Sequence, residues 1–258
     1  MRLHSMGVEI NYEQYGSAGP NVLLLHGWGC SVALWKPIAE RLSGSMRVTA
    51  VDFPAHGESG RMSEPWDAKA FADQIVDIIH QLGLEGCTVI GHSHGGRVAL
   101  SLAIDHPRLI DKLIITCGAG VKPKKTFKRE MRSRSYKIMR GILSALETTR
   151  LFGKLPEYGK EALRQKFGSK DYNALDAEMR KTFVLLVSGD ITDELPRVSQ
   201  PTLLIWGERD TETPLWMGKL MEEKIPDAGL VVFEDAGHFA YLEQPDRFSA
   251  IASQFILD

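Results

Sequence analysis

Short apolar runs rich in β-branched residues alternate along this chain with segments of helical periodicity. Continuous apolar strands that are joined by helices are typical of a parallel sheet covered on both faces. The chain is therefore predicted to be an α/β protein with a mostly parallel central sheet flanked by helices. The predicted strands span residues 21–26, 47–52, 87–92, 109–117, 202–207 and 229–235.

Three helices of this core can be bounded from the sequence. One has an apolar residue at every third or fourth position and ends at Gly83, a typical C-cap. Another lies between Pro214 and Pro226, and the last one follows Pro245. Residues 8–16 alternate only in part, and we expect them to form an antiparallel strand at the edge of the sheet.

The regular alternation lapses between about residues 120 and 195. A chain of 258 residues suits one large domain or one domain with an insertion. We therefore expect a core formed by residues 1–119 and 196–258, with residues 120–195 as the insertion. Within the insertion, three segments are predicted to be helical, at 141–147, 160–168 and 177–187.

The charge balance and the apolar pattern exclude several classes of protein. Lys and Arg number 31 against 33 Asp and Glu, so the chain lacks the positive excess of a nucleic-acid-binding protein. No run approaches the roughly 18 apolar residues of a transmembrane segment, and the first ten residues lack the apolar region of a signal peptide. The expected location is cytoplasmic. The 3 cysteines are widely spaced, which fits neither a disulfide framework nor a metal-binding pair.

The clearest chemical signal is Gly91-His92-Ser93-His94-Gly95, which matches the pattern G-x-S-x-G. It follows a predicted strand and precedes a predicted helix, the context in which a serine is held on a sharp turn. The positions two before and two after this serine must lack side chains, and both are glycine. Ser93 is therefore the candidate nucleophile.

A serine hydroxyl is a weak nucleophile and needs a base, which an acid in turn orients. Asp210 and His238 lie in the loops after the last two predicted strands, at the edge where ligands of open α/β sheets bind. The loop after residues 109–117 begins with Gly-Ala-Gly and offers no carboxylate there. Asp235 is only three residues from His238 and suits a turn. The order Ser93, Asp210, His238 thus predicts a catalytic triad.

Two backbone amides are predicted to stabilise the oxyanion of a tetrahedral intermediate. One is the N–H of Trp28, in the glycine-containing turn HGWG that follows the strand at residues 21–26. The other is the N–H of His94, the residue after the nucleophile. The ring of Trp28 either forms a wall of the acyl site or packs beneath the insertion.

The motifs HGWG, GHSHGG, WGERD and GHF resemble, in this order and spacing, those of the α/β-hydrolase superfamily. Residues 52–59 are similar to its D-x-x-G-H-G-x-S loop, with Ala55 where glycine is usual. The resemblance implies an α/β-hydrolase fold in which the insertion is a helical cap over the active site. Ser93 stands where the epoxide hydrolase and dehalogenase branches carry Asp.

No metal or cofactor is expected. His92 and His94 are explained by the turn around Ser93, and the chain has neither an H-E-x-x-H motif nor a cysteine pair. Nucleotide-binding patterns of the types GxxxxGK[ST] and GxGxxG are also missing from the sequence.

Arg97 lies one helical turn after Ser93 and is a candidate for binding a substrate carboxylate. The alternative is an arginine that pairs with a buried acid of the scaffold. The sequence Gly-Gly-Arg at this point resembles the menaquinone-pathway lyase of the same superfamily, in which the triad promotes elimination without an acyl-enzyme.

Residues 121–150 contain ten basic residues against two acidic ones. This asymmetry concentrates positive potential on the predicted cap. It suits an anionic substrate, a phospholipid surface, a solvated helix face or an acidic carrier domain, the last of which a resemblance to the biotin-pathway ester hydrolase implies. Met139 and Leu143 are predicted to line an acyl tunnel, on a face shared with Tyr136, Ile142 and Leu146.

Three hypotheses follow. The first is a serine hydrolase that cleaves small to medium carboxylic esters through an acyl-enzyme. The second is a cofactor-free hydrolase of carbon–carbon bonds, or a lyase of the menaquinone-pathway type, acting on a carboxylate substrate. The third is an inactive protein that binds a small ligand. The apparently complete triad favours the first.

Overall fold

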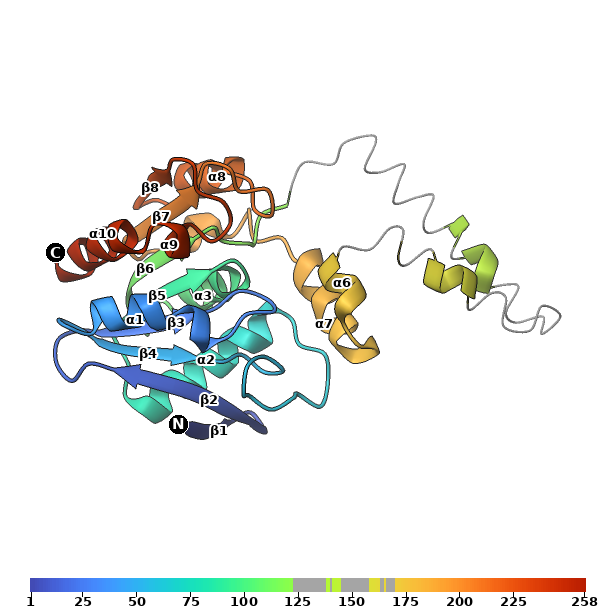
Figure 1. Ribbon diagram of the computed structural model, residues 1–258, viewed down its shortest axis with the longest axis horizontal. Helices are drawn as coiled ribbons and strands as arrows, with labels where there is room; N and C mark the ends of the chain where they lie inside the picture. The colour runs from blue at the N-terminus through green and yellow to red at the C-terminus, as the bar shows by residue number, and fades with distance from the viewer. Residues whose placement is uncertain (123–137, 140, 145–157, 163–164, 166–169) are drawn as a thin grey trace. The chain divides into compact units, whose positions relative to one another are not determined.

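An eight-stranded sheet forms the centre of the described chain (Figure 1). The computed structural model describes residues 1–122, 138–139, 141–144, 158–162, 165 and 170–258. The strand order is β1-β2-β4-β3-β5-β6-β7-β8, and the six strands from β4 to β8 in this order pair in parallel. The strands are β1 (Arg2–Ser5), β2 (Val8–Tyr15), β3 (Asn21–Leu25), β4 (Arg47–Val51), β5 (Cys87–His92), β6 (Ile110–Thr116), β7 (Thr202–Gly207) and β8 (Ala228–Phe233).

All six predicted parallel strands are confirmed to within about two residues. The strand predicted at residues 8–16 is antiparallel as expected, but it is not the edge of the sheet, because β1 pairs with it in a hairpin. The two turn residues, Met6 and Gly7, have φ values of 49° and 77°, as a tight two-residue hairpin turn requires. Methionine is an unusual residue for such a turn, so β1 was not predicted.

The helices confirm the three boundaries expected for the core. Asp67 caps α2 by accepting a hydrogen bond from the amide of Ala70 at 2.9 Å, and Gly83 ends the helix with a φ of 62°. Among the described residues, no helix is both long enough and apolar enough to cross a membrane. The α-helices are α1 (Lys36–Leu42), α2 (Ala68–Leu82), α3 (His94–Asp105), α6 (Lys170–Ala174), α7 (Ala177–Ser188), α8 (Trp216–Lys224), α9 (Ala240–Glu243) and α10 (Pro245–Leu257), with short 3-10 turns η1 (Val32–Leu34) and η2 (Leu195–Arg197).

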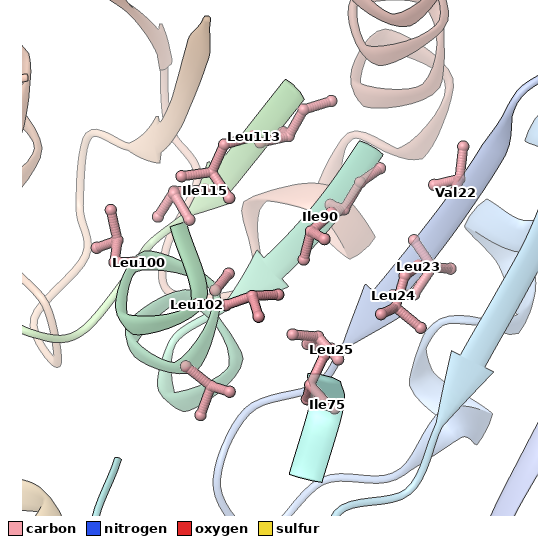
Figure 2. Close-up of a cluster of buried hydrophobic side chains, with 14 of the residues drawn as sticks. Val22, Leu23, Leu24, Leu25, Ile75, Ile90, Leu100, Leu102, Leu113 and Ile115 are labelled. Atoms are coloured by element: carbon pink, nitrogen blue, oxygen red, sulfur yellow. The ribbon is translucent and has the colours of Figure 1, made fainter. Parts of the chain in front are cut away.

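The buried core fixes the ends of the central strands. Side chains of β3, β5 and β6 are completely buried together with residues of α2 and α3 (Figure 2). Burying one Leu or Ile side chain contributes roughly 1.5–3 kcal/mol, so the loops that leave these strands start from rigid positions. The labelled members of the cluster are Val22, Leu23, Leu24, Leu25, Ile75, Ile90, Leu100, Leu102, Leu113 and Ile115.

The chain divides into two compact units, one formed by 1–121 with 184–258 and the other by 122–183. Residues 184–195 were expected in the insertion but belong to the first unit. Individual contacts with the core give the reason. Leu195 is completely buried, and the amide of Ile191 donates a hydrogen bond to the carbonyl of Gly120 at 3.0 Å. Of the predicted insertion helices, 177–187 is confirmed as part of α7, whereas 145–147, 163–164 and 166–168 lie outside the described residues.

The loop after β4 adopts a glycine-like turn without the glycine. Ala55 has a φ of 62°, in the left-handed region, and its amide donates to the carbonyl of Gly60 at 2.8 Å. The buried carboxylate of Asp52 holds the same loop by accepting the amides of Val32 at 2.7 Å and Glu58 at 3.0 Å. These bonds maintain the turn although an alanine in this conformation costs about 1–2 kcal/mol.

Replacing Ala55 with glycine removes this cost, and we expect Ala55→Gly to leave the free energy of unfolding unchanged or to raise it by about 1 kcal/mol. The matched control is Ala250→Gly at an exposed position of α10, which is expected to lose about 0.5–1 kcal/mol. Urea unfolding of both variants measures the difference. Equal losses in the two variants would show that Ala55 is unstrained.

Candidate active site

Ser93 occupies a strained turn between β5 and α3. Its φ of 50° and ψ of −110° lie outside the regions that non-glycine residues favour. The turn is held by its own backbone, because the amide of Ser93 donates to Thr116 O at 3.2 Å and its carbonyl accepts the amides of Arg97 and Ala119 at 3.1 and 2.9 Å. Ser93 therefore lies at the N-terminus of α3, where the helix dipole favours negative charge.

The glycines on either side of Ser93 are required by close backbone contacts, as the sequence predicted. A Cβ atom on Gly91 would lie 2.5 Å from the carbonyl oxygen of Gly95, and one on Gly95 would lie 2.2 Å from that of Leu25. Both distances are shorter than any tolerated carbon contact. The turn can therefore close on itself only when Gly91 lacks a side chain, and it can pack against the end of β3 only when Gly95 lacks one.

Asp210 and His238, from the loops after β7 and β8, are joined by a hydrogen bond. Nδ1 of His238 lies 2.9 Å from Oδ2 of Asp210, whose side chain has no exposed surface. The amides of Glu212 and Thr213 each donate to Oδ1 of Asp210 at 2.9 Å. Burial raises the pKa of Asp210, but the hydrogen bond and charge of His238 and the bonds from Thr213 outweigh it and hold this pKa below its ordinary value.

Thr213 completes the surroundings of this pair and was not identified from the sequence. Its hydroxyl oxygen lies 2.8 Å from both Oδ2 of Asp210 and the carbonyl oxygen of Cys117, and 3.3 Å from Nδ1 of His238. Because both oxygens only accept, the hydroxyl donates to one of them at a time. The only sequence signal for Thr213 was its position three residues after Asp210.

The loop that carries His238 contacts the residue before Ser93. Nε2 of His92 lies 2.9 Å from the carbonyl oxygen of His238, and the two imidazole rings are 4.8 Å apart between centroids. The structure thus brings the predicted acid, the predicted base and the turn of the predicted nucleophile to the same edge of the sheet.

The turn HGWG lies against Ser93. A Cβ atom built on Gly27 would lie 3.3 Å from Cβ of Ser93, so a backbone segment that was predicted to supply an oxyanion donor is adjacent to the nucleophile. The ring of Trp28 contacts the rings of His94 and His56, at centroid distances of 5.7 and 4.8 Å. That the amides of Trp28 and His94 bind an oxyanion stays a prediction.

The histidines around this turn are buried and neutral. Phe53 donates its amide to Nε2 of His26 at 3.0 Å, so the ring hydrogen is on Nδ1, which lies 2.7 Å from the carbonyl oxygen of Gly27. Burial, reinforced by the charge of a neighbouring histidine, lowers the pKa of both His26 and His92 to about 3. The pKa values of His56 and His94 are lowered too, again chiefly by burial.

Arg97 is buried and faces backbone carbonyl groups. Its Nη1 donates to the carbonyl oxygens of Leu186 and Gly189, the latter at 3.2 Å, where α7 ends. Burial lowers the pKa of Arg97 to about 10, against the opposing charge of Asp190, so the group remains cationic at neutral pH. A cation at the C-terminus of a helix is favourable. Binding of a substrate carboxylate by Arg97 stays a prediction.

Met139 and Leu143 lie in the second unit, where both are partly buried. Leu143 packs near Gly159, since a Cβ atom there would lie 2.8 Å from Cδ2 of Leu143. Tyr136 and Leu146 lie outside the described residues, as do the basic residues of 121–150 except for Lys122. The predicted tunnel and the predicted anion site therefore stay predictions.

Within the described chain, one group of three side chains offers metal-ligating atoms within 4.8 Å of one another: Cys117, Asp210 and His238. The hydrogen bond between Asp210 and His238 already uses two of these atoms. Burial raises the pKa of the Cys117 thiol far above its ordinary value, which disfavours the thiolate that a metal needs. We assign these residues to the acid–base pair and its packing.

The buried histidines make stability depend on pH. Their folded-state pKa values are lowered, so between pH 6.5 and about 3 the unfolded chain binds protons that the folded chain does not, and stability falls as the pH falls. We expect His26 and His92 each to lower the free energy of unfolding by about 2 kcal/mol between pH 7 and pH 5. Urea unfolding at both pH values measures this. His92→Gln should weaken the dependence of stability on pH. The control His4→Gln, at an exposed position, should leave it unchanged. A wild-type stability that does not change between the two pH values would contradict the assignment of neutral buried histidines.

Removing the hydroxyl of Thr213 takes away the one donor that the buried carboxylate of Asp210 and the buried carbonyl of Cys117 share. We expect Thr213→Val to lower the free energy of unfolding by about 1–3 kcal/mol. Thr211→Val, the same substitution at an exposed position two residues earlier, should change it by less than about 0.5 kcal/mol. Similar effects of the two substitutions in urea unfolding would mean that the Thr213 bonds contribute nothing.

A sequence model of the alpha/beta hydrolase family matches residues 22–251 of the chain. A pimeloyl-[acyl-carrier protein] methyl ester esterase of Aeromonas hydrophila subsp. hydrophila is 28% identical over 265 residues, covering 96% of this chain and all of the esterase. A 2-hydroxy-6-oxononadienedioate/2-hydroxy-6-oxononatrienedioate hydrolase of a Pseudomonas species is 26% identical, covering 96% of this chain and 91% of the relative.

The fold also matches solved structures. The crystal structure of a membrane phospholipase A, described as a bacterial virulence factor, superposes with a TM-score of 0.77 at 25% identity, covering 99% of this chain and 84% of that one. The family match spans most of the sequence, including the turn at Ser93 and the loops of Asp210 and His238. The chain therefore belongs to the alpha/beta hydrolase family.

Proposed function

We propose that this hydrolase cleaves carboxylic esters through an acyl-enzyme formed on Ser93. The observation that carries the proposal is the hydrogen bond between Nδ1 of His238 and Oδ2 of Asp210. The carboxylate only accepts, so Nδ1 carries the hydrogen and Nε2 keeps its lone pair. An imidazole oriented in this way is the general base that a serine nucleophile needs.

In the proposed reaction, Nε2 of His238 takes the hydroxyl proton of Ser93 as Oγ bonds to the ester carbonyl carbon. The same proton then passes to the leaving alcohol as the ester carbon–oxygen bond breaks. Water, deprotonated by His238, attacks the acyl-enzyme and releases the acid, and Ser93 regains its proton. Asp210 stabilises the imidazolium that forms in both halves. Neither half requires a cofactor or a metal.

The amides of Trp28 and His94 are proposed to bind the negative oxygen of the tetrahedral intermediates. The packing of Gly27 against Ser93 supports this role for the HGWG turn, and the strained turn supports it for His94, the first residue of α3. One such donor is commonly worth about 3 kcal/mol in the barrier.

The substrate class is proposed from the relatives and the charge pattern. The Aeromonas relative is named as a methyl ester esterase of pimeloyl-[acyl-carrier protein]. The ten basic residues of 121–150 favour an anionic substrate or an acidic carrier in this chain as well. Apolar residues such as Met139 and Leu143 suit a small to medium acyl chain.

Cleavage of a carbon–carbon bond is the second candidate, because the Pseudomonas relative is named as a hydrolase of oxo-dienedioate compounds. The lyase hypothesis depends on Arg97 as an anion ligand. The bonds from its Nη1 to Leu186 and Gly189 make that role less favourable, since part of the guanidinium is already engaged.

Replacing the nucleophile tests the proposal. With a p-nitrophenyl ester, we expect the wild-type protein to release p-nitrophenol in a burst followed by steady turnover, and Ser93→Ala to lose the burst and at least about 10⁴-fold in kcat. Ser101→Ala, at a buried position of the same helix α3, is the matched control and should keep both.

The other outcomes separate the hypotheses. A burst that persists in Ser93→Ala would refute the acyl-enzyme at this residue. Inertness toward p-nitrophenyl esters combined with turnover of a 2-hydroxy-6-oxo-dienoate would favour carbon–carbon cleavage. Binding of such compounds without turnover of either class would favour an inactive binding protein.

A further inference from the structure

We propose that His92 is a positioning residue that holds the backbone of His238 in place through a hydrogen bond from its Nε2–H. The inference rests on the proposed role of His238 as the base. His238 lies in a loop after β8, and its side chain is oriented by Asp210 through Nδ1. That bond sets the direction of the ring but leaves the position of the loop itself to other contacts.

The hydrogen bond of His92 has a defined direction. Its Nε2 lies 2.9 Å from the carbonyl oxygen of His238, which only accepts, so Nε2 carries the hydrogen. The other ring nitrogen, Nδ1, is buried without a hydrogen-bond partner among the described residues. A Cβ atom on Gly27 would lie only 2.8 Å from this Nδ1, so Gly27 leaves just enough room for the ring.

The surroundings keep this imidazole neutral. The residue is only 1% exposed. Burial is the largest cause that lowers its pKa to about 3, followed by the charge of His238. A second ring proton on Nδ1 would have no acceptor, so the ring remains a single-donor tautomer at neutral pH.

Ring contacts connect His92 to the whole loop. Its centroid lies 4.8 Å from that of His238, 5.0 Å from that of Phe239 and 5.0 Å from that of Tyr241. Tyr241 in turn stacks on Trp35 at 4.3 Å, and both of these side chains are completely buried. The position of His238 is thereby tied to the core on one side and to the residue next to Ser93 on the other.

This arrangement gives His92 a specific task. Ser93 and His92 share one rigid backbone turn, so a bond from His92 to the main chain of His238 fixes the base relative to the nucleophile. A displacement of about 1 Å between reacting groups can cost about 100-fold in rate. We call the hydrogen bond from His92 to the carbonyl of His238 the tether. Its loss should therefore lower kcat while substrate binding is retained.

Three substitutions of His92 separate the donor from the packing. Glutamine places an N–H donor where Nε2 stood, asparagine places one only where Nδ1 stood, and leucine is apolar and has no donor. We expect His92→Leu and His92→Asn to lose about 10- to 100-fold in kcat on a p-nitrophenyl ester with KM changed less than threefold. His92→Gln should recover kcat to within about fivefold of the wild type.

A control variant tests whether a loss of stability alone lowers kcat. Ile75→Val, a core substitution far along the chain from the site, should lower the free energy of unfolding by about 0.5–1.5 kcal/mol and leave kcat unchanged. The tether is refuted if His92→Leu keeps wild-type kcat, if its loss falls on KM, or if a folded His92→Gln is as slow as the other variants. Because wild type and Ser93→Ala test the hydrolase itself, an active wild type with unaffected His92 variants would overturn the tether alone.

A measurement on the wild-type protein guards against variants that fail to fold. In ¹⁵N spectra of histidine-labelled protein, we expect His92 to carry its hydrogen on Nε2, with Nδ1 unprotonated, throughout pH 5 to 8. A ring protonated on Nδ1 would have no hydrogen to donate to His238 from Nε2 in its neutral form, and that result would overturn the proposal.

Discussion

The strained backbone of Ser93 is the constraint on which the site depends. A residue with a φ of 50° is stable only where its surroundings hold it in that conformation. Here the amide of Ser93 donates to Thr116, and its carbonyl accepts the amides of Arg97 and Ala119. Gly91 lets the turn close on Gly95, and Gly95 lets it pack against the end of β3. The rigid core around β3, β5 and β6 stabilises the strained turn. The hydroxyl of Ser93 therefore lies at the carboxyl edge of the sheet.

The other groups of the site lie at the same edge of the sheet. The turn after β3 lies against Ser93, the loop after β7 supplies Asp210, and the loop after β8 supplies His238. Each of these loops is fixed by hydrogen bonds that do not involve a substrate, such as the amides of Glu212 and Thr213 on Asp210. The pair of Asp210 and His238 is therefore organised before any ligand arrives, which is the condition for efficient electrostatic stabilisation of a transition state.

Most of the fold could be predicted because its signals are local. Continuous apolar runs identified the parallel strands, and Asp210 and His238 followed from the rule that ligands bind at the carboxyl ends of such strands. β1 was missed because a four-residue strand with a Met-Gly turn has almost no periodic signal. The end of the insertion was placed too late because residues 184–195 are held by tertiary contacts, such as that of Ile191 with Gly120. The bond of Thr213 to the carbonyl of Cys117 and that of His92 to the carbonyl of His238 were missed for the same reason, because each joins residues that lie far apart in the sequence.

The central claim is that Ser93 is made nucleophilic by His238 and Asp210. Mass spectrometry after a short incubation with a fluorophosphonate tests it most directly, because the reagent reacts with activated serines. The account predicts one adduct per chain, on the peptide that contains Ser93, and a much slower reaction in His238→Ala. An unmodified Ser93, an adduct on another residue, or labelling at an unchanged rate without His238 would contradict it.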